Sequence, residues 1–287
     1  MQQPLNRFLL LQPAWLPTVL FIPLLYALGW LAAVPLTLLG LPTDQLSLTG
    51  TVLSFALFLL VMPRWAALRW SAAHPWRALG IRNNSPQTHR GLAALLNGLL
   101  IACCLLSLIA APLLTCNWAH WHWQGTWGLA FNALLLLFGV GLAEELIFRV
   151  WLWEELRQTK RKHYAIIGQA LIFSVVHTRF NLGLLAMTGL LIGLFLLGCV
   201  LALLRHRDHG SIWSCVGLHG GLVSGWFILN QCLIAIKDDA PTWLIGPGDT
   251  QPNPLGGAVA IGALLICAHI FKRKNNETGT NAHIKTY

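Results

Sequence analysis

The stretch WGLAFNALLLLFGVGLAEELIFRVWL, residues 127–152, is apolar along almost its whole length but holds two glutamates and one arginine. A helix of about 20 residues crosses a hydrocarbon core about 30 Å thick, so this run is long enough to span a membrane. Its charged residues are Glu144, Glu145 and Arg149. Ionisable side chains inside a membrane are costly, and they usually face a bundle interior or a watery cavity and mark function. The run therefore predicts a membrane helix that carries a functional site.

The whole chain has the composition of a membrane protein. Of its 287 residues, 56% are hydrophobic and 10% are charged, whereas soluble domains average about 45–50% and about 25%. Eight apolar runs have about the length of a membrane-spanning helix. They lie near residues 15–40, 46–63, 91–115, 127–152, 164–180, 183–204, 211–233 and 254–271. We therefore predict an all-α integral membrane protein in which about eight transmembrane helices form one bundle, with a single membrane domain over residues 1–287.

Basic residues gather in alternate connections between these runs. The chain has 19 Lys and Arg residues against 10 Asp and Glu residues, a formal net charge of +9. The basic connections and the tail contain Arg64, Arg69, Arg77, Arg82, Arg90, Arg157, Lys160, Arg161, Lys162, Arg205, Arg207, Lys272, Arg273 and Lys274. Loops rich in Lys and Arg stay on the cytoplasmic side, so we predict a multi-pass protein with both termini in the cytoplasm. We expect these residues to contact lipid headgroups, and we expect no nucleic-acid partner.

Three ionisable side chains on three different runs reach comparable depth. At 1.5 Å per residue, Glu144 lies roughly 14 Å, His177 roughly 20 Å and His219 roughly 12 Å from the predicted ends of their spans. Glu145 and Arg149 are four residues apart, so they share a helix face and can form an ion pair. Glu144 points about 100° away from Glu145. We therefore expect a supporting pair, Glu145 with Arg149, beside an unpaired carboxylate at Glu144 that suits a general base.

Other interpretations of these residues stay open. A buried Glu–Arg pair can be purely structural, and a membrane histidine can simply pack, so the alternative is a non-catalytic scaffold, regulator or transporter. Carboxylates and imidazoles are also zinc ligands. However, no two of Glu144, His177 and His219 come from one helical face, and the chain has no HExxH motif and no cysteine pair with metal-ligand spacing. We therefore expect neither a metal ion nor another cofactor.

The same residues fall in motifs that resemble a known family. EELIFR at 144–149 matches the EExxxR motif of the CPBP family, which contains the CAAX proteases and the bacteriocin-processing or Abi proteins. FSVVH at 173–177 matches its FxxxH motif, and residues 189–226 resemble its third region, in which His219 follows a basic turn. The resemblance implies a metal-independent intramembrane endopeptidase with its core over residues 127–230. Its substrate would be a membrane-associated peptide or protein, lipidated or not.

The resemblance also assigns roles to the residues. In such enzymes the first glutamate of EExxxR activates a water molecule, which implies this role for Glu144. The histidine of FxxxH positions that water, and the third-motif histidine stabilises the oxyanion, which implies these roles for His177 and His219. Glu145 and Arg149 would then support the site. We expect a cavity among the fourth to seventh spans that opens toward the cytoplasm.

One position departs from the family pattern. The family's prenyl-protein proteases carry an asparagine four residues after the third histidine, where this chain has Val223. A side-chain donor to an oxyanion is worth about 2.7–4 kcal/mol where it acts. Ser224 is adjacent but rotated by about 100° on an ideal helix. Either His219 alone suffices, or a backbone donor substitutes, or the protein is a weak or inactive protease.

Overall fold

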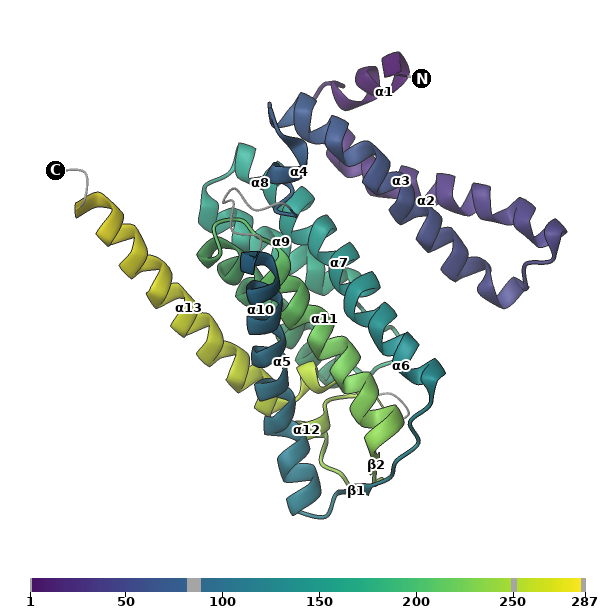
Figure 1. Ribbon diagram of the computed structural model, residues 1–287, viewed down its shortest axis with the longest axis vertical. Coiled ribbons are helices and arrows are strands. Elements are labelled where there is room, and N and C mark those ends of the chain that lie inside the picture. Colours follow the sequence, from purple (N-terminus) through teal and green to yellow (C-terminus); the bar gives the residue numbers. More distant parts are fainter. Residues whose placement is uncertain (1, 82–88, 249–251, 285–287) are drawn as a thin grey trace. The chain divides into compact units, whose positions relative to one another are not determined.

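The computed structural model describes residues 2–81, 89–248 and 252–284 (Figure 1). The chain forms two compact units, Met1–Leu79 and Gly80–Tyr287, and each is described by itself. The single membrane domain over residues 1–287 stays a prediction. Arg82, one of the basic residues of the second predicted connection, lies outside the described residues.

The first unit is a helical hairpin with short flanking helices. Its elements are α1 (Gln2–Leu9), α2 (Trp15–Ala33), the 3-10 helices η1 (Val34–Leu39) and η2 (Thr43–Gln45), α3 (Leu46–Arg69) and α4 (Pro75–Ala78). Helices α2 and α3 pack closely because Gly29 has no side chain: a Cβ there would come within 2.6 Å of the carbonyl oxygen of Gly50. Arg69 binds the start of the unit by donating to the carbonyl oxygens of Leu9 and Ala14, at 3.0 and 2.8 Å.

The second unit is a helical bundle with a small two-stranded ribbon. Its elements are α5 (His89–Thr115), β1 (Ala119–Trp121), α6 (Trp127–Leu134), η3 (Leu135–Val140), α7 (Gly141–Glu144), η4 (Glu145–Leu152), α8 (Trp153–Thr159), α9 (Lys162–Val176), α10 (Leu184–Arg207), α11 (Trp213–Ile228), η5 (Leu229–Leu233), β2 (Ile234–Ile236), α12 (Thr242–Ile245), η6 (Pro254–Gly256) and α13 (Ala258–Ile284). The segments η3, η4 and η5 are π-helical. The ribbon pairs Ala119 with Ile236 in antiparallel register.

Four helices of the described residues are long and apolar enough to cross a membrane. They are Trp15–Leu39, Thr43–Arg69, Gly91–Thr115 and Leu184–Arg207. Many of their large apolar side chains point outward, as expected of helices that face lipid. The protein is thus a predominantly α-helical integral membrane protein, with the β1–β2 ribbon as an addition that the sequence pattern did not predict.

The predicted count of eight spans is not reproduced, and the differences have local causes. The fourth predicted span is one helical run, but it is divided into α6, η3, α7 and η4 by changes between α and π hydrogen bonding. The fifth, α9, has only 15 residues and ends at Val176. In the seventh, α11 has 16 residues and passes into η5. These helices are shorter than the roughly 20 residues of a simple spanning helix.

Helix α11 lies at the centre of the second unit, against α5 on one side and η3 and α7 on another (Figure 1). Ten of its residues are buried, from Ser214 to Ser224 with Val223 only partly so. The main apolar cluster joins Leu218 and Leu222 of this helix to Phe173 of α9 and Leu197 and Leu201 of α10. A helix enclosed in this way can hold polar groups away from both water and lipid.

Candidate active site

Three charged side chains of the second unit come from the helical run that contains α7 and η4. Glu144 is the last residue of α7, and Glu145 begins η4. The side chain of Glu145 is fully buried and Arg149 is 1% exposed, whereas the side chain of Glu144 is 24% exposed. The two adjacent glutamates therefore occupy different environments, one enclosed in the core and one at its boundary.

Glu144 lies between two imidazole rings from other helices. Its Oε2 atom is 3.4 Å from Nε2 of His177 and 3.7 Å from Nε2 of His219. His177 follows the last turn of α9, and His219 lies in the middle of α11. Residues 33 and 75 positions away from Glu144 thus meet at one carboxylate oxygen, which brings the three predicted catalytic residues together.

The tautomer of His177 follows from its second contact. Its Nδ1 atom lies 2.7 Å from the carbonyl oxygen of Phe173, and a carbonyl can only accept, so Nδ1 carries a proton. A neutral His177 then turns an acceptor, Nε2, toward the carboxylate of Glu144. Two acceptors facing each other need a proton or a water hydrogen between them. The pair is therefore suited to holding a water molecule.

His219 is oriented by Glu145. Its Nδ1 atom donates to Oε1 of Glu145 at 2.8 Å in a buried hydrogen bond, and its ring meets the edge of the Phe173 ring at a centroid distance of 5.6 Å. A carboxylate that accepts from Nδ1 fixes the orientation of the ring and leaves Nε2 as the nitrogen that can contact other groups. That second nitrogen is the one that lies near Glu144.

Glu145 also pairs with Arg149, as the four-residue spacing predicts. Its Oε2 atom is 3.4 Å from Nε of Arg149, and the guanidinium carbon lies 4.1 Å from the centre of the Phe173 ring. Glu145 therefore connects the arginine to His219, a link that the sequence pattern did not predict. The sequence pattern also did not predict that Phe173, the first residue of the FSVVH motif, is part of the site.

Glycines explain how α11 comes close enough for these contacts. A Cβ on Gly141 would lie 2.9 Å from the Cα of Gly220, and a Cβ on Gly220 would collide with the carbonyl oxygen of Leu137. On another face of α11, Gly217 lies against Gly98 of α5, where a Cβ would lie 3.1 Å from the Gly98 Cα. Small residues let helix backbones approach closely, and here they place His219 within reach of both glutamates.

Replacing Gly220 by alanine should therefore lower stability, although alanine normally favours a helix. The added methyl group meets the backbone of Leu137, and overpacking of this kind costs about 1–3 kcal/mol. Thermal unfolding of the detergent-solubilised protein measures the effect. Gly262 of α13 is the matched control, because nothing lies within 4 Å of a Cβ there; Gly262→Ala should be neutral or stabilise by up to about 1 kcal/mol. Equal shifts for both variants would contradict this account of the contact between η3 and α11.

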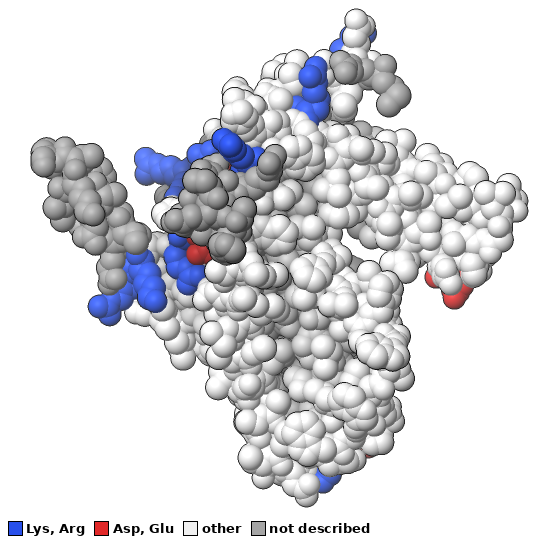
Figure 2. All heavy atoms as spheres, in the orientation of Figure 1, with Lys and Arg blue, Asp and Glu red and all other residues white. Residues whose placement is uncertain are grey.

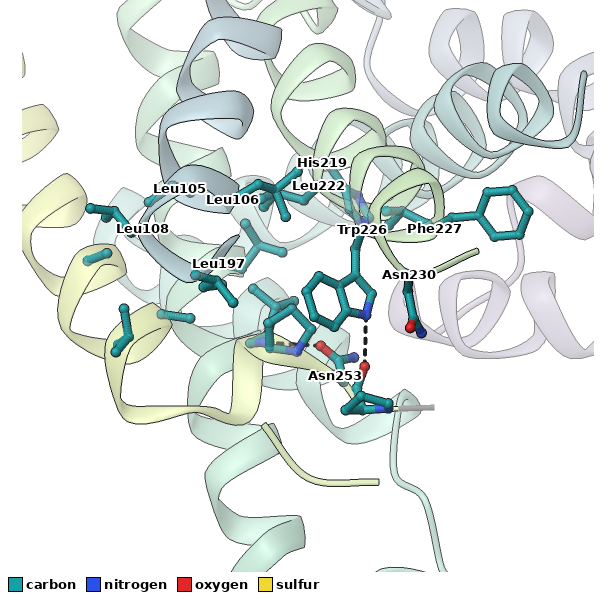
Figure 3. Close-up of a pocket in the computed structure, with 18 of the residues that line it drawn as sticks. Leu105, Leu106, Leu108, Leu197, His219, Leu222, Trp226, Phe227, Asn230 and Asn253 are labelled. Atoms are coloured by element: carbon teal, nitrogen blue, oxygen red, sulfur yellow. Dashed lines mark hydrogen bonds between the residues drawn. The ribbon is translucent and has the colours of Figure 1, made fainter. Parts of the chain in front are cut away.

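A cavity of about 410 Å³ adjoins His219 (Figure 3). Leucines of α5, apolar residues of α10 and α13, and the segment 252–255 line it together with α11. Trp226 of α11 lies across it and donates from Nε1 to the carbonyl oxygen of Pro252 at 2.9 Å. Val223 lines the same cavity as His219. The fourth, fifth and sixth predicted spans contribute one residue each, Leu136, Arg179 and Leu197, whereas α5, α11, the segment 252–255 and α13 form most of the wall. The cavity therefore corresponds only in part to the one predicted among the fourth to seventh spans.

The described residues contain no group of three or more His, Cys, Asp or Glu side chains arranged to hold a metal ion. Glu144, His177 and His219 approach one another through a single carboxylate oxygen and two ring nitrogens, and His219 is already engaged by Glu145 on its other nitrogen. That this site works without a metal ion stays a prediction from the sequence, to be tested by chelation.

Comparison with known proteins places these residues in a family region. Residues 125–224 match the model of the type II CAAX prenyl endopeptidase Rce1-like family, which confirms the resemblance to CAAX proteases. Residues 2–74 match the model of a domain of unknown function, DUF8676, and this match covers most of the first unit. No curated protein and no solved structure matched the chain. The CAAX endopeptidase match contains Glu144, His177 and His219.

Proposed function

We propose that the second unit is an intramembrane endopeptidase that hydrolyses a peptide bond with a water molecule activated by Glu144. The observation that carries the proposal is the meeting of Glu144 with His177 and His219 at one carboxylate oxygen, inside a region that matches a CAAX endopeptidase family. The catalytic core is residues 127–230, and the mechanism needs no metal ion and no cofactor.

Glu144 and His177 together bind and activate the water. Both present acceptors to it, so the water donates one hydrogen to each and its lone pairs face away from them, toward the scissile carbonyl. As the water oxygen bonds to the carbonyl carbon, its proton moves to Glu144. When the C–N bond of the tetrahedral intermediate breaks, Glu144 returns this proton to the leaving nitrogen. The products are a carboxylic acid and an amine, and the acid then passes its remaining proton to the amine or to water.

His219 stabilises the negative charge that develops on the carbonyl oxygen. Glu145 accepts from its Nδ1–H, so when Nε2 also carries a proton, that second N–H donates to the oxyanion. Preorganised donors of this kind act strongly where water is excluded, and His219 is only 5% exposed. Arg149 balances the charge of Glu145 and keeps it in place.

The substrate is a membrane-associated peptide or protein, with or without a lipid. The cavity beside His219 supports an apolar segment next to the scissile bond, because leucine side chains and Trp226 form much of its wall. The matching family is named for prenyl endopeptidase activity, so prenylated peptides are the first substrates to test. Cleavage of a mixed library of lipidated and unlipidated peptides by the purified protein, with and without a chelator, tests the function and the metal independence together.

We also propose that the end of the second unit where α9 begins and α10 ends lies at the cytoplasmic surface. Basic residues gather there (Figure 2), and Lys162 at the start of α9 contacts His206 of α10, with 2.5 Å between Nζ and Nε2. Both termini are then cytoplasmic, and the shorter helical runs complete about eight crossings. Accessibility of single cysteines to a membrane-impermeant reagent in intact cells measures this orientation.

Glu145→Gln should lower kcat by about 10²-fold with little change in KM. Glutamine still accepts a hydrogen bond from His219, but it has no negative charge to hold His219 and Arg149 in place. The oxyanion donor is then misplaced, and the loss of such a donor costs about 10²–10³-fold. Steady-state kinetics on a peptide found in the library measure both constants. An unchanged kcat would remove His219 and Glu145 from the proposed reaction.

A further inference from the structure

The last turn of α10 carries a buried arginine that contacts the helical run containing Glu144 and Glu145. Arg205 is 7% exposed, and its Nη1 atom donates to the backbone carbonyl oxygen of Arg149 at 2.7 Å. The same nitrogen lies 3.7 Å from Oε1 of Glu154 in α8. Arg205 therefore reaches both the π-helical segment η4 and the α-helical turn that follows it.

The backbone of η4 is irregular at the atom that Arg205 binds. In an α-helix the N–H of Trp153 would donate to the carbonyl oxygen of Arg149, four residues earlier. Here it donates to the carbonyl oxygens of Phe148 and Val150 instead. A buried carbonyl needs a donor, and hydrogen bonds from a charged donor are stronger than neutral ones. The guanidinium of Arg205 thus donates to the backbone carbonyl at which α-helical hydrogen bonding is interrupted.

The interruption affects which way the catalytic side chains point. A π-turn holds one residue more than an α-turn, so losing it would rotate the residues on one side of η4 by about 100° relative to those on the other. Glu145 lies at the first residue of η4 and Arg149 at the fifth. The hydrogen bond from Arg205 opposes that rotation at Arg149, four residues from the carboxylate that orients His219.

We propose that Arg205 is a positioning residue, which holds η4 in its π-helical register and so keeps Glu145 and Arg149 aligned with His219. Its effect on hydrolysis rests on the proposed function, whereas its effect on the backbone does not. Arg205 touches none of the three proposed catalytic side chains and acts through the carbonyl of Arg149. The π-helical register of residues 145–152 therefore depends on a contact with the end of α10, about 50 residues later in the chain.

The test compares Arg205→Met with Arg207→Met in the full-length protein in detergent. Arg207 lies two residues away and pairs with Asp208 at 2.9 Å, and its guanidinium lies over the ring of Phe271, so its loss should leave η4 unchanged. Hydrogen exchange of residues 141–153, followed by mass spectrometry, reports the register. We expect exchange there to rise about tenfold or more in Arg205→Met and to stay at the wild-type rate in Arg207→Met.

Two further variants separate the contacts of Arg205. Arg205→Lys keeps a charged donor for the carbonyl of Arg149 and should restore most of the protection, and it also serves if the methionine variant does not fold. Glu154→Gln removes the charge partner but leaves the carbonyl bond, so we expect near-normal exchange in 141–153. For hydrolysis, Arg205→Met should lower kcat about ten- to a hundredfold with KM unchanged.

Two outcomes would overturn the proposal. Wild-type exchange of residues 141–153 in Arg205→Met would mean that Arg205 does not hold η4. Exchange that rises equally over α10, α11 and η4 would mean that Arg205 stabilises the whole bundle and has no particular role at this segment. If no peptide is cleaved by the wild type, the proposed function fails, but the exchange of residues 141–153 still decides whether Arg205 holds the register.

Discussion

Glu144→Gln is expected to lower kcat for peptide hydrolysis by about 10²–10⁴-fold, which is the range for loss of a general base. Glutamine has nearly the same shape and can still bind a water molecule, but it cannot take the proton that the water must lose. KM should change little, because the apolar wall of the cavity beside His219 is unaltered. Initial rates of the purified variant on a cleavable peptide provide the measurement.

The matched control is Asp44→Asn, which makes the same carboxylate-to-amide change in η2 of the first unit and should leave kcat unchanged. A fully active Glu144→Gln variant would support the alternative in which the buried charges are structural. Altering Glu145 or Arg149 should lower stability under either account, because their side chains are fully buried and removing one partner of a buried pair costs about 3–5 kcal/mol. Under the structural alternative this loss of stability is the only effect, so kcat of such variants is compared per folded protein.

Val223→Asn is expected to raise kcat by about 10²–10³-fold. Val223 lies four residues after His219, on the same helix face, and both line the same cavity. An asparagine amide at this position would add a second donor to the oxyanion, and such a donor is worth about 2.7–4 kcal/mol. The comparison uses kcat of the two proteins on the same peptide, with folding checked by thermal unfolding.

Val223→Leu is the control for size, because leucine resembles asparagine in shape but has no donor. It should leave kcat near the wild-type value. If Val223→Asn is no faster than wild type, the oxyanion position is already complete, through His219 alone or with a backbone N–H. If both variants slow the reaction, Val223 contributes to the wall that binds substrate.

Much of the candidate site was predictable from the sequence because it depends on residue type and spacing. Charges inside apolar runs are rare enough to identify Glu144, Glu145 and Arg149, and the i, i+4 rule pairs the last two. The apolar runs near 15–40, 46–63, 91–115 and 183–204 correspond to the four long apolar helices. Their hydrophobicity is continuous, so length alone predicts them.

The features that were not predictable depend on backbone details with no clear signal in one sequence. The sequence predicts side-chain directions along 127–152 from an α-helix with 3.6 residues per turn, whereas η3 and η4 are π-helical. The contact of Glu145 with His219 therefore does not follow from the sequence. The close approach at Gly141 and Gly220 could have been suspected from the glycines, but not assigned to a helix pair. The cavity depends on where α13 and the segment 252–255 lie against α11, which is a tertiary property.

The most direct test of water activation by Glu144 is oxygen-18 incorporation. Wild type and Glu144→Gln are incubated with a cleavable peptide in H₂¹⁸O, in detergent and with a chelator, and the products are analysed by mass spectrometry. We expect the wild type to yield a new C-terminal carboxylate that carries one ¹⁸O atom, and Glu144→Gln to yield about 10²–10⁴-fold less of it in the same time. Equal amounts of labelled product from both proteins, or no cleavage by either, would contradict the assignment of Glu144 as the base.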